Sequence, residues 1–170
     1  DASLNMRCVT RFRIRARPDS RDVIPLELDG GMRVKSAKVD GAPVEFYQHD
    51  SLRGELVQNS GNQLFLIVPP HPLETGSEHE IEVVHEGKLV TQTGGGIYSV
   101  SARGTWYPGR GAQFATYDVT FHYPENLNLV SAGAIREERT RDGIRTTHRV
   151  PEGKLRLLGF NLGQYTRREF

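Results

Sequence analysis

The sequence predicts an all-β fold, either a β-sandwich or a saddle-like set of curved sheets that are mostly antiparallel. Polar and apolar side chains alternate with a period of two along much of the 170-residue chain, which is typical of half-buried strands. Amphipathic stretches of helical period are nearly absent, and 18 glycines and 9 prolines interrupt the pattern. We therefore expect one β domain over residues 1–170, with a hinge near residues 88–110, where Gly, Ser and Thr are frequent.

The first expected strand, residues 6–17, has one apolar and one basic face. A row of arginines is compatible with phosphate binding, but Asp and Glu on neighbouring strands can neutralise it, and we expect a solvated face. The apolar face carries Met6, Cys8, Phe12, Ile14 and Ala16, and the basic face carries Arg7, Arg11, Arg13, Arg15 and Arg17.

Later strands are separated by turn signals. Asp40-Gly41 predicts a tight turn, and Pro69-Pro70 ends a strand because proline cannot donate to a ladder. Tyr117, Val119, Phe121 and Tyr123 share one face of the most regular strand. The expected strands are residues 23–28, 32–39, 44–47, 63–68, 78–86, 97–100, 116–123 and 155–161, with a hairpin or pair of strands over 129–150 around Arg141-Asp142-Gly143.

Composition and net charge argue against a nucleic-acid-binding module and against a membrane span. The net charge of +1 argues against a nucleic-acid-binding module, and no stretch approaches the roughly 20 apolar residues needed to cross a bilayer. Cys8 is the single cysteine and is expected to be a buried small hydrophobe. The sequence opens without Met or a signal peptide, so we expect an upstream segment to have been removed; secreted, periplasmic and cytoplasmic locations all stay open.

No complete catalytic or metal-binding pattern is found in the sequence. His79 and His85 are six residues apart on an expected strand, about 20 Å at roughly 3.3 Å per residue, whereas a zincin places His-Glu-x-x-His on a helix. The glycine runs 94–96 and 109–111 fit neither a P-loop nor a dinucleotide fingerprint, and there is no Gly-x-Ser-x-Gly elbow. Carboxylate pairs at 80/82 and 137/138 are expected on solvated strand faces, although a glycosidase pair needs only to meet in space. We predict no catalytic, cofactor-binding or metal-binding residue in this chain.

Trp106-Tyr107-Pro108 is the most distinctive local cluster. Its aromatic rings fit a buried anchor that pins a loop to a sheet. They also fit a surface that faces a ligand or a second domain. Both interpretations stay open from the residues alone.

From this cluster onward the chain resembles the N-terminal domain of the M1 family of zinc aminopeptidases. In that family an aromatic-Pro stretch is followed by a Phe/Tyr-Asp-hydrophobic-Thr strand that ends near proline, and residues 115–124 read Ala-Thr-Tyr-Asp-Val-Thr-Phe-His-Tyr-Pro. The similarity continues through residues 129–133 and 157–165, and more loosely through 24–28 and 39–46. The order of these pieces covers nearly the whole chain.

The resemblance implies a saddle-shaped β domain that packs against a thermolysin-like catalytic domain and helps to close its substrate cleft. The family's Gly-x-Met-Glu-Asn loop and zinc-binding helix follow this domain, so zinc and peptidase activity are expected in the parent protein and not in this chain. The chain's partners would then be that catalytic domain and the parent's peptide substrate. Residues 98–105 lack the family's substrate-binding Gln or Glu, and 109–113 replace its acidic run, which points to a divergent branch.

Two hypotheses follow. The first is a non-catalytic N-terminal domain of an M1-like metallopeptidase, with Tyr98, Arg103, Trp106 and Tyr107 as the candidate cleft or interface residues. The second is a free-standing binding β-sandwich, such as a carbohydrate-binding or adhesion module, that uses Trp106 and Tyr107 as a stacking platform.

Overall fold

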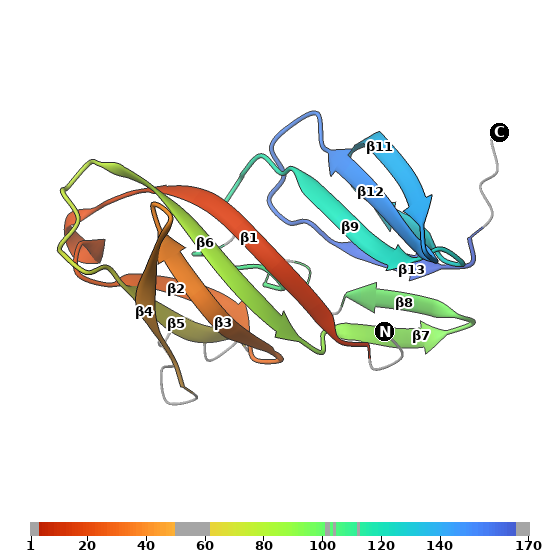
Figure 1. Cartoon of the computed structure of the whole chain (residues 1–170), viewed down its shortest axis with the longest axis horizontal. Coiled ribbons are helices and arrows are strands. Elements are labelled where there is room, and N and C mark those ends of the chain that lie inside the picture. Colours follow the sequence, from red (N-terminus) through yellow and green to blue (C-terminus); the bar gives the residue numbers. More distant parts are fainter. Residues whose placement is uncertain (1–3, 50–61, 101–102, 104, 112, 166–170) are drawn as a thin grey trace. The chain divides into compact units, whose positions relative to one another are not determined.

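A computed structural model describes residues 4–49, 62–100, 103, 105–111 and 113–165, and they are nearly all strand and loop (Figure 1). The predicted all-β class, with antiparallel curved sheets, is confirmed. The chain divides into two compact units. The N-terminal unit comprises Asn5–Leu89 and Thr105–Gly111, and the C-terminal unit comprises Leu4 and the described parts of Val90–Gly104 and Ala112–Phe170.

One six-stranded antiparallel sheet forms the N-terminal unit, in the order β1-β6-β3-β4-β5-β2. A short 3-10 helix, η1 (Pro18–Ser20), follows the first strand. In this sheet β6 lies between β1 and β3, so the last strand of the unit pairs with its first and third strands. Its strands are β1 (Met6–Arg15), β2 (Ile24–Asp29), β3 (Met32–Val39), β4 (Ala42–Gln48), β5 (Asn62–Val68) and β6 (Glu78–Gly87).

The inward face of this sheet supplies the apolar core. Alternate residues of β2 and β6 are buried, as the period-two pattern predicts. Full burial of one apolar side chain contributes about 1.5–3 kcal/mol to the free energy of unfolding. The fully buried side chains of this sheet together therefore outweigh any single surface contact. The apolar side chains with no exposed surface in this unit are Leu28, Met32, Phe65, Ile67, Ile81 and Val83.

The Trp106 segment lies along the outer edge of this sheet, within the same unit. The amide of Asp29 donates to the Thr105 carbonyl (2.9 Å), and Glu27 and Gly109 exchange two backbone hydrogen bonds of 2.7 and 3.1 Å. These bonds satisfy part of the free edge of β2, which would otherwise present unpaired amides and carbonyls.

Two smaller antiparallel sheets make up the C-terminal unit, a four-stranded sheet in the order β10-β13-β8-β7 and a three-stranded sheet in the order β11-β12-β9. Phe121 of β9 and Phe160 of β13 meet edge to face at 5.4 Å between ring centroids, which joins the two sheets. The strands are β7 (Val90–Gly94), β8 (Ile97–Val100), β9 (Val119–Pro124), β10 (Asn128–Ser131), β11 (Ala134–Arg141), β12 (Ile144–Val150) and β13 (Phe160–Gly163).

Two arginines of β12 fasten the loops of the C-terminal unit through backbone carbonyls. Arg145 donates to the carbonyls of Leu127 (3.3 Å) and Glu125 (2.9 Å). Arg149 donates to the carbonyls of Ser131 (2.9 Å) and Gly133 (2.8 Å). A planar guanidinium with several fixed donors suits such multiple contacts better than lysine would.

Most predicted strands are confirmed, with corrections at the C-terminal end. The expected strand 116–123 begins only at Val119, and the expected strand 155–161 is instead β13, Phe160–Gly163, preceded by an isolated bridge between Leu155 and Ala115. The region 129–150 holds three strands where one hairpin or pair was predicted, although the turn at Asp142-Gly143 is confirmed by positive φ angles of 51° and 76°. Residues 90–94 form a strand that the sequence analysis did not predict.

Candidate functional site

The four candidate cleft or interface residues fall in different units. Tyr98 and Arg103 belong to the C-terminal unit, and Trp106 and Tyr107 belong to the N-terminal unit. Tyr98 lies on β8, where it pairs with Gln92 and with β13, and its side chain is half-buried. Arg103 is exposed, and its aliphatic stem lies so close to Gly159 that a Cβ added there would be 3.0 Å from the Arg103 Cγ.

Trp106 and Tyr107 pack against each other. Their rings are perpendicular, with centroids 5.0 Å apart, and only 7% of Trp106 is exposed. The backbone bonds on either side of the pair hold this segment against β2, as described above. This burial is what an aromatic anchor of the loop requires, and Tyr107 is the more accessible ring of the two.

The arginine row of β1 is neutralised by a row of glutamates on β6. Arg11 bonds Glu82 at 2.7 Å and Arg15 bonds Glu78 at 2.8 Å, and Lys38 of β3 reaches the same Glu82 at 2.9 Å from the other side. These bonds hold the pKa of Glu82 below its usual range, with the Lys38 contact first and the Arg11 contact second. The predicted solvated, charge-balanced face is confirmed. The register pairs are Arg7 with Glu86, Arg11 with Glu82, Arg13 with Glu80 and Arg15 with Glu78.

His79 and His85 both lie on β6 but have separate partners. The Nε2 atom of His85 is 3.0 Å from the hydroxyl of Thr10. His85 has no exposed surface, and burial lowers its pKa to about 4, so the ring is neutral. Cys8 faces it across the ladder and is partly buried, and burial raises the pKa of its thiol to about 12. A thiol with so high a pKa is a poor nucleophile at neutral pH.

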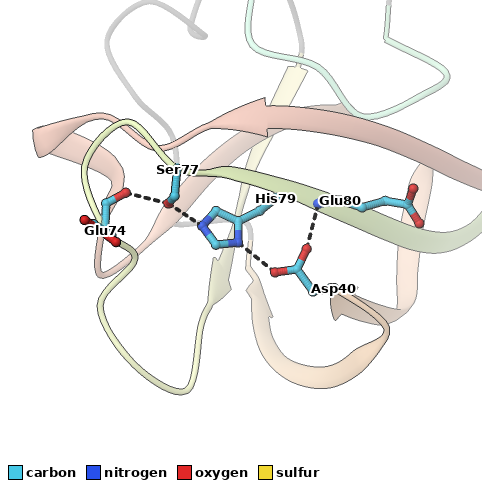
Figure 2. A network of polar contacts seen from close by, with 5 residues as sticks. All are labelled: Asp40, Glu74, Ser77, His79 and Glu80. Carbon is cyan, nitrogen blue, oxygen red and sulfur yellow. Dashed lines mark hydrogen bonds and ion pairs between the residues drawn. The ribbon is translucent and has the colours of Figure 1, made fainter.

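A polar network around His79 was missed in the sequence analysis (Figure 2). The Nδ1 atom of His79 is 2.7 Å from Oδ2 of Asp40, and its Nε2 atom is 2.6 Å from the hydroxyl of Ser77. That hydroxyl is also 2.5 Å from the Glu74 carbonyl. The second Asp40 oxygen accepts from the Glu80 amide at 2.9 Å.

Ser77, His79 and Asp40 stand in the order of a nucleophile, its base and the group that orients the base. A serine nucleophile must give its proton to the histidine. Here the Ser77 hydroxyl donates to the Glu74 carbonyl at 2.5 Å, since a carbonyl cannot donate, so its proton is not directed at His79. The Gly76 and Ser77 amides, which could stabilise an oxyanion, already donate to the carbonyls of Ala16 and Glu74. The arrangement therefore fits a structural network better than an acyl-transfer site.

A second group of polar residues lines a shallow hollow on the three-stranded sheet of the C-terminal unit. His122 shares a hydrogen bond of 2.9 Å with Thr146, and His148 one of 2.8 Å with Asp118. The hollow measures about 150 Å³, whereas pockets for small-molecule ligands usually enclose about 300 Å³ or more. Its lining residues are Thr120, His122, Glu137, Arg139, Thr146 and His148.

Within the described residues, no group of three or more His, Cys, Asp or Glu side chains is arranged to hold a metal ion. The same part of the chain has no helix long and apolar enough to span a membrane.

The comparisons with known proteins identify the fold. No protein-family model and no curated protein sequence matches the chain. Solved structures do match, among them M1 zinc metallopeptidases. The chain has the β fold found in M1 zinc metallopeptidases. This confirms, at the level of the fold, the resemblance predicted from the sequence.

Three structures illustrate the match. A mutant M1 zinc metallopeptidase from Deinococcus radiodurans, bound to a Tyr-Ser-Ala substrate, is 17% identical with a TM-score of 0.73. A two-domain M1 zinc metallopeptidase mutant bound to L-arginine is 18% identical with a TM-score of 0.74, and the M1 zinc metallopeptidase from Deinococcus radiodurans is 18% identical with a TM-score of 0.71. Each match covers 94% of this chain but only 38% of the M1 structure.

Proposed function

We propose that this chain is a non-catalytic N-terminal β domain of an M1-like zinc metallopeptidase, of the aminopeptidase type. In the parent it packs on the catalytic domain and helps to shape the substrate cleft. The observation that carries the proposal is the fold match over 94% of this chain and 38% of M1 zinc metallopeptidases. At that coverage, more than half of such an enzyme lies outside the aligned β region.

The distribution of the histidines supports a non-catalytic role for the chain. His79 and His85 of the N-terminal unit are engaged by Asp40, Ser77 and Thr10, and His122 and His148 of the C-terminal unit by Thr146 and Asp118. A catalytic zinc site needs three protein ligands around one open position. In this proposal, residues of the parent that lie beyond this chain therefore hold the zinc and carry out the peptide-bond chemistry.

The candidate residues then divide by task. Trp106 anchors its loop on β2, and Tyr107, Tyr98 and Arg103 offer more accessible surface to the catalytic domain or to the peptide substrate. Residues 88–110 act as a hinge in this proposal. Its support is that the chain passes between the two compact units at residues 89–90 and again at 104–105.

A free-standing carbohydrate-binding or adhesion module is the second candidate. A stacking platform must present the face of an aromatic ring to the sugar, and Trp106, at 7% exposure, does not. The burial of Trp106 therefore favours the metallopeptidase domain over the sugar-binding module.

Two measurements test the proposal. The reading frame downstream of Phe170 should encode a Gly-x-Met-Glu-Asn segment and a His-Glu-x-x-His helix within about a hundred residues; a stop codon or a further β module there would count against it. The isolated chain should not hydrolyse aminoacyl-p-nitroanilides. Hydrolysis that a zinc chelator abolishes would show that the chain is itself a metallopeptidase.

A further inference from the structure

The open edge of β1 is long and regular. β1 is an outermost strand of the six-stranded sheet and pairs with β6 through ten consecutive residue pairs without a register shift. The opposite outermost strand, β2, contains Pro25 and is partly closed by backbone bonds to Thr105 and Gly109. In the described part of this unit, no backbone hydrogen bond reaches β1 from the side away from β6. Proline, a bulge or a covering segment usually protects such an edge, and β1 contains neither proline nor bulge.

The backbone groups on this edge belong to alternate residues of β1. In an antiparallel ladder, a residue that does not bond its partner strand directs both its amide and its carbonyl to the other side. The Asp40 amide donates to the Glu80 carbonyl at 2.9 Å, so the backbone of Glu80 faces β3 and not β1. Its register partner Arg13 therefore faces away from β6, as do the residues at steps of two along the strand. These residues are Arg7, Val9, Arg11, Arg13 and Arg15, and their side chains are also the exposed ones of β1.

The inward face of the sheet is incompletely covered at β1. Inward side chains of β6 such as Ile81 and Val83 have no exposed surface, whereas those of β1 are only half-buried. The sheet has no strand beyond β1 that could cover them. A further strand would bury more of this surface with its own inward side chains. The inward residues of β1 are Met6, Cys8, Thr10, Phe12 and Ile14.

The outward face of β1 carries arginines that β6 does not pair. Glu86, the register partner of Arg7, is bonded to Lys35 of β3 at 3.0 Å. Arg13 lies opposite Glu80 in the register but forms no ion pair with it. Among the described residues, Arg7 and Arg13 therefore have no carboxylate within ion-pair distance. A neighbouring strand with acidic side chains at these positions would be stabilised, because opposite charges across two strands attract.

We infer that the open edge of β1 binds an extended acidic segment of a partner protein, which adds a further strand to the sheet. The backbone of this segment pairs with the outward amides and carbonyls of β1, so that every second side chain lies on the outer face, opposite the arginines. Carboxylates at those positions attract Arg7 and Arg13, and apolar residues between them cover the inward face. This binding role is additional to the proposed function and does not depend on the catalytic domain.

Two other occupants fit the same edge less well. A second copy of β1 would place one row of arginines opposite another, and like charges directly opposite each other are destabilising. A nucleic acid would attract the arginines, but it has no regular row of amides and carbonyls to complete a strand ladder. An acidic polypeptide accounts for the unpaired backbone, the half-buried inward side chains and the unpaired arginines together.

Amide exchange of the whole chain, measured by NMR, tests the pairing. The probe is an end-capped peptide of ten residues, the length of β1, in which Glu alternates with Val and Thr; a peptide with Lys in place of Glu is the control. With the acidic peptide at about ten times its Kd, exchange of the outward amides of Val9, Arg11 and Arg13 should slow about tenfold. The lysine peptide should leave it unchanged. Outward amides that keep their rapid exchange while the acidic peptide is bound, or no binding at about 1 mM, would overturn the inference.

Substitutions on β1 separate the backbone from the charge. Val9→Pro removes one outward amide and no bond of the β1–β6 ladder, because proline is tolerated on an edge where its missing amide faces solvent. It should weaken binding of the acidic peptide about fivefold, whereas Val9→Thr, which keeps the amide, should not. Circular dichroism and Trp106 fluorescence verify that each variant is folded.

A double variant, Arg7→Gln with Arg13→Gln, should also weaken binding about fivefold, and it decides the question if proline perturbs the fold. Unchanged affinity in this variant would overturn the inference. An oligothymidylate that binds as tightly as the acidic peptide would do the same, since charge alone would then suffice. A dimer of the free chain that Val9→Pro dissociates would assign the edge to a second copy and likewise overturn it.

Discussion

Gly87→Ala gives a sharp test of the packing between β6 and β3. Gly87 is the last residue of β6, where Met6 and Met32 pair with it from opposite sides. A Cβ at this position would overlap the Gly31 carbonyl oxygen and lie 2.8 Å from the Cα of Met32. Both obstacles are backbone atoms, so no side-chain rotation relieves the overlap, and the two strands must separate locally.

The expected loss of stability follows from these contacts. Overpacking costs about 1–3 kcal/mol, and a ladder hydrogen bond lengthened by the separation costs about 1 kcal/mol more. Alanine restricts the unfolded chain more than glycine does, which raises the free energy of unfolding by about 0.4–1 kcal/mol. The net effect is a loss of about 2 kcal/mol, which shifts the urea midpoint by about 1 M at a typical dependence on denaturant.

Trp106 is the natural probe, because it is the only tryptophan of the chain and lies buried in the same unit as Gly87. Its fluorescence during urea unfolding reports that unit. Gly109→Ala is the control, since an added Cβ there has nothing within 4 Å. Midpoints for the two variants that agree within about 0.3 M would refute the steric argument.

Three further predictions concern buried polar groups. Cys8, with a pKa of about 12, should resist thiol reagents at pH 8 in the native chain and react once urea unfolds it; equal rates in the two states would contradict this. His85 is neutral when folded and has a pKa of about 4, so the unfolded chain binds more protons between that value and 6.5. Stability should fall as the pH drops through this window, and His85→Gln should flatten the dependence in urea titrations. Thr147→Val should lower the free energy of unfolding of the C-terminal unit by about 1–3 kcal/mol, as measured by circular dichroism. The reason is that Thr147 is fully buried, accepts a hydrogen bond from Tyr123 at 2.7 Å and donates one to Glu138 at 2.9 Å. An unchanged midpoint would show that these bonds contribute nothing.

The strands that could be predicted are those in which one face is buried. β1, β2 and β6 alternate cleanly, so their positions follow from the side-chain period alone. β7 could not be found this way, because four of its five residues are exposed and carry no apolar alternation. Residues 116–118 continue the alternation of exposed and half-buried side chains before β9, but they do not belong to the strand. Side-chain periodicity reflects burial and does not show whether the backbone pairs with a neighbouring strand.

The network around His79 shows a different limit. Ser77 and His79 are two residues apart in sequence, but Asp40 lies 39 residues before His79, and the contact exists only because β6 pairs with β3. Strand order of this kind is not encoded in local periodicity. The sequence revealed the Asp40-Gly41 turn and the alternation of β6 separately, and only the sheet brings them together.

The pairing of β6 with both β1 and β3 explains the charged ladder and the polar network around His79 together. Outward positions of β6 carry Glu78, Glu80 and Glu82 against basic residues, and inward positions carry two histidines and apolar side chains. A slip of one residue would turn glutamates into the core and apolar residues into water, so the register is strongly fixed. The same register that balances the arginine row therefore determines that His79 meets Asp40, and any change that weakens the ladder should also weaken the His79–Asp40 contact.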